Sequence, residues 1–130
     1  MRAWPTTLLA LGLLAAPAAA DPLPAVPVTV GGEPDLDACG GLAEVHGLDP
    51  RGANRLSVRA GPGTGYPRLD RLGPRVRLIV CEERGDWLGV VYGPPGLDCG
   101  LGSPIPDATA YRGPCRSGWV AARYVALIAG

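Results

Sequence analysis

The four cysteines and the single histidine are the residues whose chemistry most restricts what this chain can do. The cysteines are Cys39, Cys81, Cys99 and Cys115, and the histidine is His46. A structural zinc site needs closely spaced ligand pairs such as Cys-x-x-Cys, and the sequence has none. A cysteine peptidase needs a thiolate beside a histidine base, and only His46 could serve. The even number of cysteines therefore favours two disulfides, with no metal and no cofactor.

Three pairings of the four cysteines are possible, and the spacing favours one of them. Residues 93–114 hold five Pro and five Gly and read as a long irregular insertion. A Cys99–Cys115 bridge would close a loop of about 17 residues across most of it, worth roughly 3 kcal/mol in the chain-entropy model. We predict that pair. The remaining pair, Cys39–Cys81, would tie the start of the first strand to the end of a central one.

The amino-terminal residues have the pattern of an export signal. Met1 and Arg2 precede an apolar stretch from Leu8 to Ala16, and the small residues Ala18-Ala19-Ala20 follow it. This predicts a signal peptide over residues 1–20, cleaved after Ala20. The stretch is shorter than the ~20 apolar residues that span a bilayer, so an uncleaved anchor is the less favoured alternative. We expect a periplasmic or secreted protein with no stable membrane insertion, where disulfides persist.

Charge and carboxylate placement exclude several function classes. The chain has 12 basic and 12 acidic residues and a formal net charge of zero. No basic block is present that could release counterions from a nucleic acid, so nucleic acid is not an expected partner. Glu44, Glu82 and Glu83 fall on strand or hairpin positions that read as solvated rather than facing each other across a cleft. We therefore expect a binding protein and not an enzyme.

The distribution of turn-forming residues along the chain predicts an all-β domain preceded by a linker. Residues 21–38 carry four prolines and the pair Gly31-Gly32, which predicts a Pro-rich linker. From Cys39 onward, short apolar runs alternate with Gly, Pro and Asp clusters. The candidate strands are 42–47, 56–59, 75–81 and 87–92. We expect the first two to pair as a hairpin, and the last two as a hairpin with Gly85 in its turn.

One segment resembles a known family. Leu56-Ser57-Val58-Arg59-Ala60-Gly61-Pro62, followed by Tyr66, is similar to the L-x-V-R-x-G-P signature of bacterial SH3 (SH3b) domains. Later landmarks of that family follow in order, namely Gly85-Asp86-Trp87, Ser117-Gly118-Trp119-Val120 and Arg123-Tyr124-Val125. The resemblance implies a small SH3-like bent β-barrel over residues 39–130, with a single-turn helix at Ala121 to Tyr124 before the last strand. The four cysteines and the 93–114 insertion depart from the family pattern.

The resemblance also implies a function. Domains of this family are commonly accessory modules for peptidoglycan or its peptides, so we expect a monomeric, non-catalytic module that binds peptidoglycan or an envelope peptide. Aromatic faces suit sugar rings and peptide stems, and an arginine suits a carboxylate. The candidate ligand-binding residues are Arg59, Tyr66, Trp87, Tyr92, Trp119 and Tyr124.

Some of the candidate aromatic residues are expected to line the binding groove and others to fill the hydrophobic core. Trp87 and Trp119 are expected to fill the core, because a small domain without Phe has little else to bury. Tyr66 and Tyr92 are favoured as ligand contacts. The alternative function is a structural or protein–protein interaction module, including an inhibitor, that docks through the disulfide-clamped 93–114 loop.

Overall fold

The computed structural model describes residues 2–14, 21–52 and 54–130, and it is all-β with antiparallel sheets. The main sheet has seven strands in the order β4-β3-β8-β6-β5-β2-β9, and β1 pairs with β7 in a separate two-stranded sheet. The bounds are β1 Thr29–Val30, β2 Gly41–Val45, β3 Leu56–Arg59, β4 Arg68–Leu72, β5 Arg77–Arg84, β6 Trp87–Tyr92, β7 Thr109–Ala110, β8 Arg116–Ala121 and β9 Val125–Ala129.

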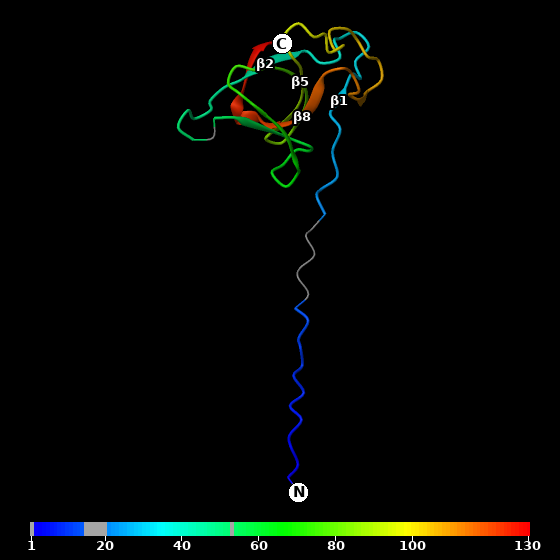
Figure 1. Cartoon of the computed structure of the whole chain (residues 1–130). Coiled ribbons are helices and arrows are strands. Elements are labelled where there is room, and N and C mark those ends of the chain that lie inside the picture. Colours follow the sequence, from blue (N-terminus) through cyan, green and yellow to red (C-terminus); the bar gives the residue numbers. More distant parts are fainter. Residues whose placement is uncertain (1, 15–20, 53) are drawn as a thin grey trace.

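The main sheet curls around one hydrophobic cluster (Figure 1). Val45 from β2, Leu72 from β4 and Val120 from β8 all belong to this cluster, although β2 and β4 lie near opposite ends of the strand order. Register shifts in the β2–β9, β3–β4 and β5–β6 pairs provide bends of the kind that β-bulges give. Among the described residues no ladder joins β4 to β9, so the sheet is strongly curved but open, and the expected barrel is not closed.

The strand pairing confirms one predicted hairpin and corrects the other. β5 and β6 pair directly through Arg84 and Trp87, and Gly85 in their turn has a φ of +57°. The segment predicted as the first strand instead pairs with β5 and β9, not with β3, so the first predicted hairpin is wrong. β3 pairs with β4, a strand that carries two Arg and an Asp and shows little apolar alternation.

A single turn of 3-10 helix, η1 (Ala122–Tyr124), precedes β9, where the SH3b resemblance implied one. It has no side-chain cap at its start. The backbone N–H of Ala122 instead donates to the carbonyl of Asp86 at 2.8 Å. The β5–β6 turn and the helical turn are therefore held side by side.

The segments predicted as a linker and an irregular insertion together build a second core. Val30 and Ala38 from the predicted linker pack with Cys99 and Leu101 from the insertion and with Val91 on β6. Alternate residues of β6 thus face different clusters, because Val90 belongs to the main one. The structure differs here from the predicted linker, since residues from 26 onward contribute buried side chains. Pro-rich sequences lack the periodicity that would reveal such packing.

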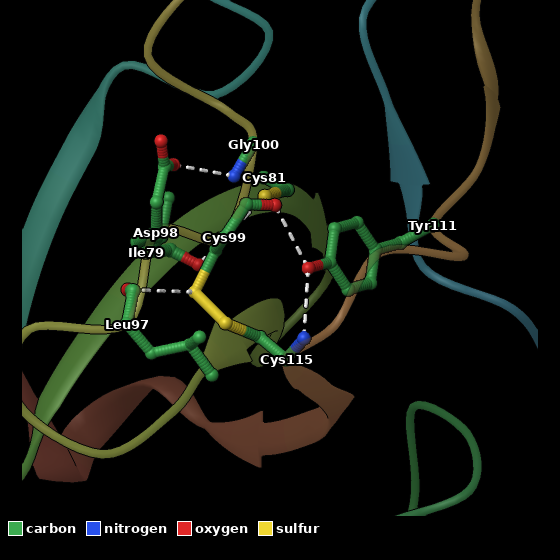
Figure 2. The surroundings of a disulfide bond; sticks show 8 residues. All are labelled: Ile79, Cys81, Leu97, Asp98, Cys99, Gly100, Tyr111 and Cys115. Carbon is green, nitrogen blue, oxygen red and sulfur yellow. Dashed lines mark hydrogen bonds between the residues drawn. A yellow bond between two sulfur atoms is a disulfide. The ribbon is translucent and has the colours of Figure 1, made fainter.

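Both disulfides lie in this second core, and they join Cys39 to Cys81 and Cys99 to Cys115, the pairs favoured by the spacing. Figure 2 shows Tyr111 beside the second bridge. Its hydroxyl donates to the carbonyl of Cys99 at 2.8 Å and accepts from the backbone N–H of Cys115 at 3.1 Å. One phenol therefore connects the two ends of the loop that the disulfide closes.

The amino-terminal residues stand apart from this domain. Residues 2–14 are irregular and exposed, and they run away from it (Figure 1). The predicted cleavage point after Ala20 lies outside the described residues. No helix in the described part of the chain is long and apolar enough to cross a membrane.

Candidate functional site

A groove of about 500 Å³ lies on the main sheet. It lies where the β5–β6 turn, the helical turn η1 and the start of β3 meet. Trp87, the first residue of β6, and Tyr124, the last residue of η1, both line it. The Ala122–Asp86 backbone bond fixes the two elements that carry these rings. The groove therefore has two aromatic side chains on elements of fixed relative position.

Three arginines surround the same groove. Arg55 immediately precedes β3, and Arg59 is the last residue of β3. Arg123 lies in η1. Asp86 is the one acidic residue in the lining. The ion pairs found in the described part of the chain are Arg84–Glu82 and Arg116–Asp70, so none of the groove arginines is neutralised by a carboxylate. The groove is consequently electropositive.

Two of these arginines are held in place by neighbours. The guanidinium carbon of Arg123 lies 4.8 Å from the centre of the Tyr124 ring, a cation–π arrangement. Nη1 of Arg59 donates to the carbonyl of Tyr66 at 3.0 Å, which fixes the side chain against the loop that follows β3. A guanidinium held in this way loses less side-chain freedom when it binds a carboxylate. The arrangement suits an anionic group attached to a ring or an aliphatic chain.

The structure brings together only some of the residues that the sequence nominated. Arg59, Trp87 and Tyr124 line the groove. Tyr66 lies next to it, packed so closely on Gly61 that a Cβ there would collide with the ring. That contact explains the glycine in the signature, because any side chain at position 61 would displace Tyr66.

Two nominated residues are part of the interior and are corrected here. Trp119 is fully buried, in agreement with the core role expected for it, and its indole N–H donates to the carbonyl of Val26. Tyr92 is 6 % exposed and belongs to the main cluster, so the preference for it as a ligand contact is wrong. Trp87 is only partly buried, so its expected core role is wrong as well. Alternation along β6 turned Tyr92 toward the cluster, while position 87 borders the turn.

Tyr92 has a structural role instead. Its hydroxyl donates to Oδ2 of Asp70 at 2.9 Å, and Arg116 contacts the same oxygen at 3.3 Å. Burial and the hydrogen bond to Asp70 raise the pKa of Tyr92 well above its usual range. Burial acts to raise the pKa of Asp70, but hydrogen bonds from the Arg71 N–H, Tyr92 and Arg116 outweigh it and lower that pKa. The network ties β4, β6 and β8 together.

Sequence reasoning missed Arg55, Arg123 and Asp86 as groove residues. Arg123 and Asp86 stand beside nominated aromatics in the landmark motifs, so adjacency to Tyr124 and Trp87 was a usable signal. Arg55 had no such signal, because nothing in the residues before β3 shows which way the chain enters the strand.

Comparison with known proteins adds no family assignment: no protein-family model matches the chain, and no curated protein or solved structure is significantly similar to it.

Proposed function

We propose that this chain is an exported, non-catalytic binding module of the bacterial SH3 type, whose groove binds a carboxylate-bearing element of the cell envelope such as a peptidoglycan stem peptide. The observation that carries the proposal is the meeting of Trp87 and Tyr124 with three arginines around one groove, none of which forms an ion pair with a described residue. Guanidinium groups bind carboxylates bidentately, and aromatic faces pack on sugar rings or aliphatic stems.

Two further observations support export and the family. Two disulfides indicate an oxidising, extracytoplasmic environment. The signature residue Arg59 and the landmark residues Trp87 and Tyr124 meet at the groove, although they are spread over more than sixty positions of the chain. The signal peptide over residues 1–20, with release into the periplasm or medium, belongs to the same proposal.

Co-sedimentation with purified peptidoglycan tests this function. The oxidised chain from Asp21 onward is mixed with sacculi, alongside Trp87→Ala and Arg123→Glu. We expect both variants to lose at least tenfold in binding, because each removes one of the two kinds of contact. Arg112→Glu is the matched control, since Arg112 is exposed and lies in the insertion, outside the groove lining.

The outcomes separate specific from general attraction. Wild-type protein that stays in the supernatant contradicts wall binding. Equal losses for Arg123→Glu and Arg112→Glu show that net charge, and not the groove, drives the association. The circular dichroism of each variant must match the wild type for the comparison to count.

The rigidity of the insertion supports a second candidate, a protein-docking module. The Cys99–Cys115 bridge and the Tyr111 hydroxyl fix the loop, and Leu97 at its surface is 43 % exposed. A loop already fixed in one conformation loses little entropy on binding a protein. If this candidate is correct, Leu97→Asp abolishes capture of an envelope partner by the immobilised domain, whereas Trp87→Ala does not.

A further inference from the structure

The segment of residues 23–30, here called the arm, lies in a cleft that fits it in detail. The carbonyl of Val26 accepts from the Trp119 indole N–H at 2.8 Å, and the Val26 N–H donates to the carbonyl of Ala60 at 2.8 Å. Leu23 reaches the loop after β3, where it lies near Gly65. Both hydrogen-bonding groups of one arm residue are thus satisfied by the main domain.

The other half of the arm is held as firmly. The N–H of Thr29 donates to Oε2 of Glu82 at 3.0 Å, and the carbonyl of Val28 accepts from the Tyr111 N–H at 2.9 Å. Val28 and Val30 are each 2 % exposed. Two buried β-branched residues separated by one position are the contact pattern of a strand seated on an apolar surface.

One side of the cleft is held by contacts within the main sheet. Oε1 of Glu82 accepts from Arg84 at 2.8 Å, and the guanidinium carbon of Arg84 lies 5.3 Å from the centre of the Trp119 ring. These residues come from β5 and β8, which pair with β6 in the main sheet. The groups that receive one side of the arm are therefore held by the main sheet, whereas Tyr111 and β7 of the insertion receive its other side.

A short hinge is the covalent tie between the arm and the domain. Gly31 and Gly32 have φ angles of +78° and +102°, and the Gly32 N–H donates to the carbonyl of Ile105. Cys39, a few residues further on, is covalently bound to Cys81. Residues 2–14 are exposed and extend away from the domain, so they do not hold the arm in the cleft (Figure 1).

We propose that this cleft is a strand-binding site that also accepts the arm of a second copy of the chain, so that two copies exchange arms. The arm's own sequence is the occupant that the cleft is shown to fit. Exchange preserves each of the hydrogen bonds and the burial of both valines, and it changes only the hinge and the number of chains. The two positive φ angles at Gly31 and Gly32 favour the closed monomer, because glycine adopts them without strain. The inference does not depend on what the aromatic groove binds.

A hinge variant tests the exchange. Gly31→Pro combined with Gly32→Pro fixes φ near −65° at both positions and removes the hydrogen bonds from the Gly31 N–H to Ala38 and from the Gly32 N–H to Ile105, so the arm cannot fold back on its own domain. In the oxidised chain from Asp21, which retains every contact described above, we expect light scattering to give twice the monomer mass. Adding Val28→Asp should return the protein to the monomer mass, because a charge cannot enter the cleft unpaired. A monomeric hinge variant, or a dimer that persists with Val28→Asp, overturns the proposal.

A second measurement does not depend on how the hinge variant folds. A specific protease site replaces residues 33–36, which are exposed, and the chain is cut only after folding and oxidation. A fluorescent peptide of residues 21–32 should then exchange into the cut domain, and the same peptide with Val28→Asp should not. Failure of the wild-type peptide to enter, once the cut arm has been washed off, refutes a cleft that takes the arm from another chain.

Discussion

Removing one oxygen atom from Tyr111 should destabilise the insertion measurably. The hydroxyl makes two hydrogen bonds, to the carbonyl of Cys99 and from the N–H of Cys115, in a partly buried position. Each such bond contributes about 1 kcal/mol net, so Tyr111→Phe should lower the free energy of unfolding by about 2 kcal/mol. For a domain of this size that corresponds to a fall in Tm of roughly 8 °C.

Urea and thermal unfolding of the oxidised protein measure this loss. Tyr66→Phe is the control, because it removes the same atom and the Tyr66 hydroxyl makes no hydrogen bond to any described residue. The loss should also depend on the bridge, since the hydroxyl connects residues that the disulfide joins. A double-mutant cycle with Cys99→Ser and Cys115→Ser should therefore show a coupling of at least 0.5 kcal/mol. Equal costs for Tyr111→Phe and Tyr66→Phe would refute the role given to the hydroxyl.

Three further predictions concern the arm, the Asp70 network and the second disulfide. Val28→Ala should lower the free energy of unfolding by roughly 2 kcal/mol because Val28 is buried. Leu23→Ala, at a position 47 % exposed, should lower it by less than about 0.5 kcal/mol. Equal losses in urea unfolding would show that the arm does not contribute to the core. The pKa of Asp70 is lowered by folding, so its carboxylate stabilises the protein above about pH 4 and this contribution is lost as the pH falls through the folded-state pKa. Asp70→Asn should accordingly lower Tm at pH 7 and converge with the wild type near pH 2, as thermal scans across pH can show. Opening Cys99–Cys115 by a double Ser substitution should lower stability by about 3 kcal/mol, and a change under 1 kcal/mol would mean that the loop stays ordered without its bridge.

The sequence was informative wherever local pattern decides structure. The alternation through β5 and β6 and the glycine at position 85 predicted a hairpin that the structure contains. The spacing of the cysteines favoured the two bridges that are present. The one-turn helix, η1, was implied only by the SH3b resemblance, and it precedes the last strand. The hairpin and cysteine signals act over a few residues or over a loop whose closure entropy depends on its length.

Local pattern failed where a partner far along the chain decides the outcome. Residues 21–38 read as a linker because prolines interrupt any periodicity, yet Val28 and Val30 are buried by the insertion and the main sheet. The sequence also assigned Trp87 to the core and Tyr92 to ligand binding, whereas Trp87 lines the groove and Tyr92 belongs to the core. Both are large and amphipathic, and only the packing of the sheet decides which of the two alternating faces of β6 meets the main cluster.

The sequence by itself indicated the all-β class and the β5–β6 hairpin and favoured the pairing of the cysteines, because turn residues, strand alternation and loop length act locally, whereas the helical turn followed only from the SH3b resemblance. Tertiary structure alone decided that the sheet stays open, that Val28 and Val30 of the arm are buried, and that three arginines converge on one groove. Those features depend on contacts between residues many positions apart, whose geometry is set by the curvature of the whole sheet and leaves no periodic trace in any one segment.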